Sequence, residues 1–281
     1  MKEISRRGFL KGALAVGAIP LTLNADKNTK NKSLKFIHIT DSHMDLADTN
    51  SVDAIKLMVE FVNENYKDLD FVCFGGDNFN NNVSGDKDAL VFREITDKLH
   101  CPTLHVRGNK ESSPKPNDSI HLDEFQKLFV QGKGLIVSGK DWLYEKNGYI
   151  LLGLDSCIEG VNNGLYTDET ISTAKKVLDG GKPTIILNHH PYTNYWGGTK
   201  KEDIHKYVLN NTDKVQKELF GYSNLILTLS GHKHIDSVKE LNKTKMIVTR
   251  GFIRPLDLDM YPMRYVEING DKISEKLIYT S

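Results

Sequence analysis

Seven side chains able to bind metal ions lie in five short clusters along this chain. They are aspartates, an asparagine and histidines, whose oxygen and nitrogen atoms suit zinc, iron, manganese or cobalt. Seven donors are too many for one tetrahedral zinc ion and suit two metal ions that share a carboxylate. A pair of metal ions favours hydrolytic chemistry, because it can activate water and hold the attacking and leaving oxygens. The donors are Asp41, His43, Asp77, Asn109, His189, His232 and His234.

Each cluster follows a short apolar run that must position it. The runs are rich in β-branched residues and bounded by Gly or Pro, which predicts buried strands. Ligands in open α/β sheets bind beyond the carboxyl ends of the strands, so we expect the seven donors to meet at one sheet edge. The glycines Gly75, Gly76 and Gly231 allow the backbone to approach this site closely. The five runs are 36–40, 71–74, 103–106, 184–187 and 225–229.

The rest of the chain alternates between helical and strand patterns. A helix is predicted over 51–66, with Ser51 as a candidate N-cap, and others over 87–99, 122–130, 168–178 and much of 202–220. Residues 134–154 predict an antiparallel hairpin that turns at Asn147-Gly148. A βαβα first half followed by a strand-rich end favours two packed sheets with helices outside. The late strands are 237–241, 245–249, 264–268 and 273–279.

The N-terminus resembles a twin-arginine export signal. Residues 5–11 read Ser-Arg-Arg-Gly-Phe-Leu-Lys and precede an apolar stretch, 12–23, that is short and glycine-rich for a membrane-spanning helix. We predict a signal peptide over 1–25, a linker over 26–33 and one catalytic domain over 34–281. The twin-arginine translocase is then a transient partner, and the mature protein is periplasmic or secreted without stable membrane association. The alternative is a basic membrane anchor that is never cleaved.

Composition narrows the class of partner. The chain has 281 residues with 37 basic and 37 acidic side chains, and no basic stripe points to a nucleic-acid partner. Its three cysteines, at irregular spacing, do not form a disulfide framework. We expect Cys73 and Cys157 to be small core residues.

The order of the motifs resembles the calcineurin-like metallophosphoesterase family. The similarity covers about residues 34 to 250. It implies an α/β fold, a four-layer α/β/β/α sandwich of two mixed sheets flanked by helices, with a dinuclear site on one edge. The motifs are Asp41-Ser42-His43, Gly76-Asp77-Asn78, Gly108-Asn109-Lys110-Glu111, Asn188-His189-His190-Pro191 and Gly231-His232-Lys233-His234.

The resemblance also implies a division of the donors. One metal ion is held by Asp41, His43 and His234, the other by Asn109, His189 and His232, and Asp77 bridges them. In the His-His-Pro motif it is His189 that is expected to bind, while His190 is structural. The metals are Fe, Mn, Zn or Co. The implied reaction is in-line attack of a metal-bridging hydroxide on a small-molecule phosphomonoester or phosphodiester, with no covalent intermediate.

One residue departs from the family pattern. The family places a histidine, a leaving-group acid or phosphate contact, where this chain has Lys110. Lys110 then donates a proton, binds a phosphate oxygen or points to solvent. Asn109, Lys110 and His189 are the predicted catalytic residues.

Substrate contacts follow from position alone. Lys110, Arg107, Tyr195 and Arg250 are the predicted substrate-binding residues, and Arg107 can equally brace its turn. Tyr195 lies in an aromatic segment that suits stacking on a base or a glycan, or packing. The irregular segment 112–119 is a candidate substrate-facing loop.

Two other functions remain open. Because Lys110 replaces the usual histidine, the chain can be a non-catalytic phosphoryl-binding protein. The same fold also suits a nucleotide pyrophosphatase or an amidase with two metals.

Overall fold

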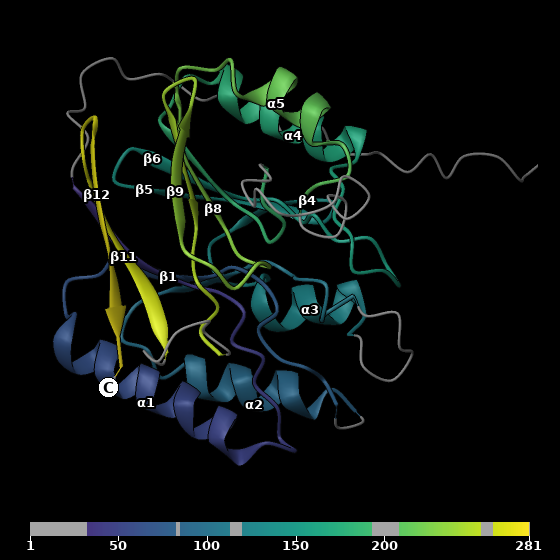
Figure 1. Cartoon of the computed structure of the whole chain (residues 1–281), viewed down its shortest axis with the longest axis vertical. Coiled ribbons are helices and arrows are strands. Elements are labelled where there is room, and N and C mark those ends of the chain that lie inside the picture. The colour runs from purple at the N-terminus through teal and green to yellow at the C-terminus, as the bar shows by residue number, and fades with distance from the viewer. Residues whose placement is uncertain (1–32, 83–84, 113–119, 193–207, 254–260, 281) are drawn as a thin grey trace, which may run out of the picture.

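The structure is a computed structural model that describes residues 33–82, 85–112, 120–192, 208–253 and 261–280. Two sheets pack face to face, and helices cover the outer face of each (Figure 1). This arrangement confirms the predicted four-layer α/β/β/α sandwich. The predicted signal peptide and most of the predicted linker lie outside the described residues. None of the helices within the described ranges is long and apolar enough to cross a membrane.

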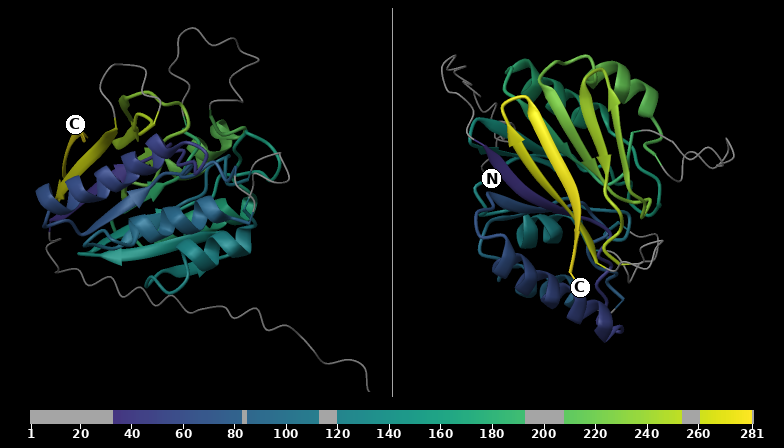
Figure 2. Two further views of the ribbon diagram at one scale, coloured as in Figure 1. Left: turned by 90° about the horizontal axis from the view of Figure 1, so that it is seen from below. Right: turned by 60° about the vertical axis from the view of Figure 1, so that its left-hand side comes forward.

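The first sheet joins strands from the two ends of the described chain. Its order is β12-β11-β1-β2-β3, with β1, β2 and β3 parallel and the other pairs antiparallel. The C-terminal hairpin therefore lies beside β1 (Figure 2). The bounds are β1 Leu34–Ile39, β2 Phe71–Phe74, β3 Thr103–His105, β11 Pro262–Asn269 and β12 Lys272–Tyr279.

The second sheet has the order β4-β5-β6-β7-β8-β10-β9. Neighbours from β6 to β10 run parallel, and β4, β5 and β9 pair antiparallel. The predicted hairpin turn is present between β5 and β6, with positive φ at Asn147 (54°) and Gly148 (86°). The bounds are β4 Ile136–Ser138, β5 Asp141–Lys146, β6 Tyr149–Gly153, β7 Thr184–Leu187, β8 Leu225–Ser230, β9 Ser237–Leu241 and β10 Thr244–Val248.

Side-chain alternation along the strands creates two cores. In β7, Ile185 and Leu187 join the larger core between the sheets, whereas Ile186 joins the core under α4 and α5. The helices α1, α2 and α3 cover the first sheet, and α4 and α5 cover the second (Figure 1). The helix bounds are α1 Thr49–Asn65, α2 Lys87–Thr96, α3 Leu122–Phe129, α4 Asp168–Asp179 and α5 Thr212–Leu219.

The start of α1 differs from the prediction. Asp48 is the N-cap, and its carboxylate accepts the backbone N–H of Asn50 at 3.1 Å. The candidate cap Ser51 is instead buried, and its hydroxyl donates to the carbonyl of Asp48 at 2.8 Å. The long helix predicted over 202–220 is also shorter in its described part, because α5 begins only at Thr212.

A buried histidine makes the fold acid-sensitive. The ring of His105 stacks on Phe74 at 4.6 Å, and neither ring nitrogen has a hydrogen-bond partner within the described structure. Burial lowers the pKa of His105 well below 6.5. Below pH 6.5 this histidine takes up a proton in the unfolded chain but not in the folded chain. The free energy of unfolding therefore decreases as the pH is lowered.

We therefore expect His105→Phe to reduce this loss by about 1.4 kcal/mol for each pH unit below the usual histidine pKa. Denaturant unfolding at several pH values, with a chelator present, measures the slope. The matched control is His121→Phe, the same replacement at an exposed histidine, and the two slopes are compared. Equal slopes for His105→Phe and the unaltered chain would contradict this account.

Candidate metal centre

The carboxyl ends of strands from both sheets meet at one edge of the sandwich. Loops after β1, β2 and β3 come from the first sheet, and loops after β7 and β8 come from the second. Backbone hydrogen bonds tie these loops together: the Asp41 N–H donates to the Gly76 carbonyl at 3.0 Å, and the His43 N–H donates to the Asp77 carbonyl at 2.9 Å. Each of the seven predicted donors lies in one of these five loops.

Three predicted donors form one compact set. The Nε2 atom of His234 lies 3.3 Å from Asp41 Oδ1 and 3.1 Å from His43 Nε2. His43 Nε2 lies 3.9 Å from the same aspartate oxygen. These atoms fall within 4.8 Å of one another, a spacing that suits a shared metal ion. Asp41, His43 and His234 therefore lie together as the sequence predicted.

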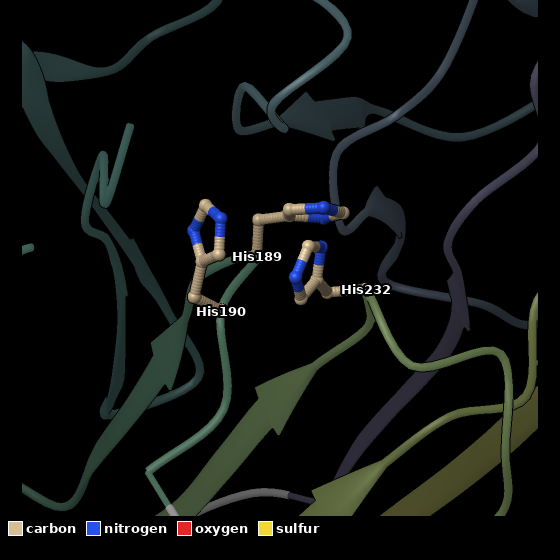
Figure 3. Close-up of side chains that lie close together, drawn as sticks. All are labelled: His189, His190 and His232. Atoms are coloured by element: carbon tan, nitrogen blue, oxygen red, sulfur yellow. The ribbon is translucent and has the colours of Figure 1, made fainter. Parts of the chain in front are cut away.

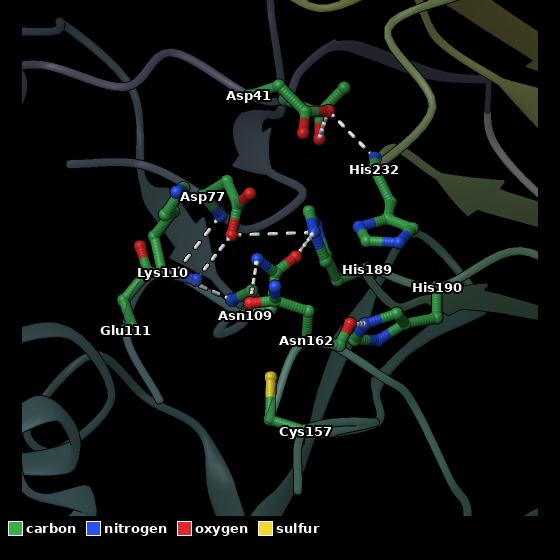
Figure 4. Close-up of polar contacts among 12 residues, drawn as sticks. Asp41, Asp77, Asn109, Lys110, Glu111, Cys157, Asn162, His189, His190 and His232 are labelled. Atoms are coloured by element: carbon green, nitrogen blue, oxygen red, sulfur yellow. Dashed lines mark hydrogen bonds and ion pairs between the residues drawn. The ribbon is translucent and has the colours of Figure 1, made fainter. Parts of the chain in front are cut away.

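Asp77 lies between this set and a second one. Its Oδ2 is 3.8 Å from His43 Nε2, and its Oδ1 is 3.4 Å from His189 Nε2. His189 Nε2 also lies 3.1 Å from Asn109 Oδ1 (Figure 4). The two carboxylate oxygens of Asp77 therefore face different donor sets, as a bridging ligand requires.

Three neighbouring imidazoles, those of His189, His190 and His232, lie at the second set (Figure 3). The ring of His232 lies 5.0 Å from that of His189 and 4.5 Å from that of His190, measured between centroids. Both nitrogens of His190 have protein partners, since Nδ1 is 2.8 Å from Ser156 Oγ and Nε2 is 3.1 Å from the Asn162 carbonyl. This geometry favours His189 and His232 as ligands over His190.

The donors are held in an uncommon backbone conformation. Positive φ angles occur at Asp41 (55°), His43 (42°), Asp77 (50°), His232 (68°) and His234 (54°). Non-glycine residues adopt this region rarely, and such residues cluster at functional sites where the surrounding structure imposes them. Five of the seven donors thus share a costly conformation that brings their side chains toward one point.

Buried polar atoms test whether the site fits a cation. Asp41 Oδ2 accepts from the Thr40 hydroxyl at 2.8 Å and from the His232 N–H at 2.9 Å. The buried Oδ1 makes no regular hydrogen bond within the described structure and lies 3.3 Å from His234 Nε2. The Nδ1 of His189 is 2.9 Å from the Gly75 carbonyl, which leaves Nε2 to face the centre. A buried carboxylate oxygen that faces imidazole Nε2 atoms provides the donor chemistry that a metal ion needs.

The model of the calcineurin-like phosphoesterase family matches residues 34–236. The chain belongs to the calcineurin-like phosphoesterases. Membership supports metal-dependent hydrolysis of phosphoesters as the class of reaction. A twin-arginine signal sequence model also matches residues 3–22, as the N-terminal motif predicted.

Relatives agree with this family. An uncharacterized metallophosphoesterase of Helicobacter pylori (strain J99) is 28% identical over 185 residues. The match covers 66% of this chain and 45% of that protein, so the chain spans less than half of that relative. A dimetal phosphatase of Danio rerio matches with a TM-score of 0.65 at 14% identity, over 88% of this chain and 99% of the other. A purple acid phosphatase of yellow lupin (Lupinus luteus) matches with a TM-score of 0.57 at 13% identity, over 90% of this chain and 52% of the other. These structures share the fold.

Charged side chains at this candidate metal centre shift one another's pKa values. Burial disfavours ionisation of Asp77, but His189 and His43 hold the pKa of its carboxyl well below the usual range. Burial likewise disfavours the charged ring of His189, but Asp77 and Asp41 raise the pKa of His189 to about 9. Metal ions bind neutral imidazole, so a raised pKa at His189 makes protons compete with metal binding.

Glu111 is a structural part of this candidate metal centre that sequence analysis did not single out. Its buried carboxylate accepts the N–H groups of Asn78 at 2.7 Å, Gly108 at 2.7 Å and Asp77 at 3.1 Å. Burial, together with Asp77, raises the pKa of Glu111 to about 7. Glu111 thus holds the loop after β2 against the loop after β3. The signal was its place at the end of the motif Gly108-Asn109-Lys110-Glu111.

The predicted substrate contacts have different settings in the phosphoesterase fold. Lys110 is partly exposed, and its backbone N–H donates to Asp77 Oδ1 at 2.7 Å. Arg107 is buried, and its guanidinium donates to Asp155 and Glu159, each at 2.7 Å, which favours the bracing role. Exposed Asn162, not singled out from sequence, places Oδ1 3.4 Å from Asn109 Nδ2.

Two further predictions concern segments near the centre. Arg250 belongs to the segment after β10, where the N–H of Phe252 donates to the Thr40 carbonyl at 2.9 Å. This contact places the Arg250 segment beside the first donor loop, and its phosphate contact stays a prediction. Tyr195 and residues 113–119 of the predicted loop lie outside the described residues.

Proposed function

We propose that this protein hydrolyses phosphomonoesters or phosphodiesters at a dinuclear metal centre. The observation that carries the proposal is the position of Asp77, whose two oxygens face His43 at 3.8 Å and His189 at 3.4 Å. One metal would be held by Asp41, His43 and His234, and the other by Asn109, His189 and His232. The mixed nitrogen and oxygen donors suit Fe, Mn, Zn or Co.

The residues of the centre would divide the work of phosphoryl transfer. Two metal ions bound there would neutralise phosphate charge and lower the pKa of a water molecule from 15.7 to about 7. Asp77 and Asp41 offset the charge of the ions and fix their spacing. Phosphoryl transfer needs chiefly positioning and charge stabilisation, so a rigid set of donors on two sheets is well suited to it.

Lys110 is the residue that we propose to distinguish substrates. The backbone N–H of partly exposed Lys110 donates to Asp77 Oδ1, which places this residue next to the centre. A lysine ammonium can hold a phosphate oxygen, but lysine is ordinarily a weaker acid than the histidine of the family. The chain should then favour esters with good leaving groups or phosphodiesters. The notion of a non-catalytic phosphoryl-binding protein rests on the same residue.

We expect Lys110→His to raise turnover of alkyl phosphates by about 10²-fold, because general acid catalysis contributes at least that much where leaving groups are poor. Turnover of p-nitrophenyl esters should change little, since p-nitrophenolate leaves without help. Steady-state kinetics on both classes measure the difference. A second variant, Lys110→Ala, removes the ammonium altogether. Its control is Lys127→Ala, which removes an exposed ammonium on α3. Unchanged turnover of every substrate in Lys110→Ala would end the hypothesis.

A substrate panel separates the candidate functions. The purified chain is loaded in turn with Mn, Fe, Zn and Co, and release of p-nitrophenol from monoesters and bis-esters is measured beside elemental analysis. Turnover with two bound ions supports the proposed hydrolase. Two bound ions without turnover of any ester would favour the phosphoryl-binding protein, and cleavage of only pyrophosphate or amide bonds would favour the other alternative.

We also propose export by the twin-arginine pathway to the periplasm or the exterior. The match of residues 3–22 to the twin-arginine signal supports it. We expect the exported protein to begin near Asp26, which N-terminal sequencing measures. A full-length N-terminus on protein that sediments with membranes would favour the uncleaved anchor.

A further inference from the structure

We propose that Asn80 and Asp45 position His43 and thereby set the affinity of one metal ion without touching it. The inference rests on the ligand assignment proposed above. Both residues lie behind His43, on the side away from Asp41 and Asp77. They orient a metal ligand, and we expect them not to affect the second donor set.

A continuous chain of side-chain contacts supports this role. His43 Nδ1 lies 3.1 Å from Asn80 Oδ1, so the ring donates its Nδ1–H and keeps the Nε2 lone pair for the centre. The amide of Asn80 then donates from Nδ2 to Asp45 Oδ2 at 3.2 Å. A neutral amide thus links a metal-facing imidazole to a carboxylate. Such outer contacts fix the tautomer and the ring orientation of a ligand and raise its basicity.

Asp45 is itself held firmly. It is 9% exposed, and its Oδ1 accepts the N–H of Ala47 at 2.8 Å. Its own N–H donates to the Ser51 hydroxyl at 2.8 Å, and the Asn82 amide donates to Oδ2. The carboxylate is therefore in place before any metal binds, and the bond from Asp45 to Ser51 in α1 ties His43 to a rigid element.

The second donor set provides an internal reference. His189 Nδ1 is oriented by the backbone carbonyl of Gly75 at 2.9 Å, which no side-chain substitution removes. Changes at Asn80 or Asp45 should therefore lower the affinity for the ion held by Asp41, His43 and His234. The ion held through His189 should keep its affinity.

The test titrates Mn²⁺ into the metal-free full chain by calorimetry. We expect two binding events in the unaltered protein, and Asp45→Asn and Asn80→Ala should each weaken one of them by about 10- to 100-fold. The affected event is identified as the one that His234→Ala removes. The matched control is Asp86→Asn, because Asp86 accepts from Asn81 at 3.1 Å in the same loop without reaching His43.

Exchanging the two residue types between positions 45 and 80 distinguishes an effect on the orientation of His43 from a general structural effect. The double variant Asp45→Asn with Asn80→Asp restores an acceptor for His43 and a donor behind it at unchanged net charge, and it should recover the lost affinity. Equal affinities in Asp45→Asn and the unaltered protein, or equal weakening of both events, would overturn the inference. Fewer than two ions bound by the unaltered protein would overturn the ligand assignment, and this inference with it.

Discussion

Replacing Asp77 by asparagine should lower phosphoester turnover by about 10³-fold. The carboxylate offers one oxygen to each donor set, and an amide can offer an oxygen to only one of them. The substitution also removes a negative charge between two cations, and loss of several kcal/mol of transition-state stabilisation corresponds to that factor. Steady-state kinetics and elemental analysis of the same preparation measure both effects, and fewer than two ions per chain are expected.

The matched control is Asp88→Asn. Asp88 is also a buried aspartate, and its Oδ1 accepts the N–H of Leu46 at 2.9 Å in the segment before α1. It is not one of the seven donors, so this variant should keep both ions and its turnover. An Asp77→Asn protein with two ions and ordinary turnover would contradict the bridging role.

Gly108→Ala should disable the centre through sterics alone. A Cβ at this position would lie 2.2 Å from the Asp77 nitrogen and 2.3 Å from Asp77 Oδ1. Backbone atoms cannot yield as a flexible side chain does, so the loops after β2 and β3 must move apart. Displacement of a reacting group by about 1 Å costs roughly 10²-fold in rate, and overpacking costs about 1–3 kcal/mol in stability. Kinetics and denaturant unfolding measure the two losses.

Gly221→Ala is the corresponding control. A Cβ at Gly221 meets nothing within 4 Å, and its φ lies outside the left-handed region. Its kinetics and stability should match those of the unaltered chain. Normal turnover in Gly108→Ala would show that the close approach of these two loops is not needed for activity.

Local patterns were sufficient to predict the frame of this site. Short β-branched runs predicted the strands that precede the donors. Parallel strands bring their carboxyl ends to one edge, so Asp41 and Asp77, which follow the paired strands β1 and β2, meet despite their separation in sequence. The pairing of turn residues also predicted the Asn147-Gly148 hairpin. These features depend on the residues of one segment and its neighbours in a sheet.

Other features depend on contacts that no local pattern encodes. Glu111 acts by accepting N–H groups from a loop more than thirty residues away, and a lone glutamate carries no sign of such partners. Asp and His tolerate positive φ better than most residues do, but the surrounding structure decides that Asp77 and His232 adopt it. The N-cap moved from Ser51 to Asp48 because both residues can cap, and the entry path of the chain decides between them.

The central claim is that two metal ions, held by two donor sets joined through Asp77, carry out phosphoester hydrolysis. The most direct measurement adds Mn²⁺ stepwise to the metal-free chain and follows hydrolysis of bis(p-nitrophenyl) phosphate and p-nitrophenyl phosphate. We predict that turnover of at least one ester appears with metal and rises until two ions are bound per chain. Full activity with one ion per chain, or hydrolysis by the metal-free protein, would contradict the account.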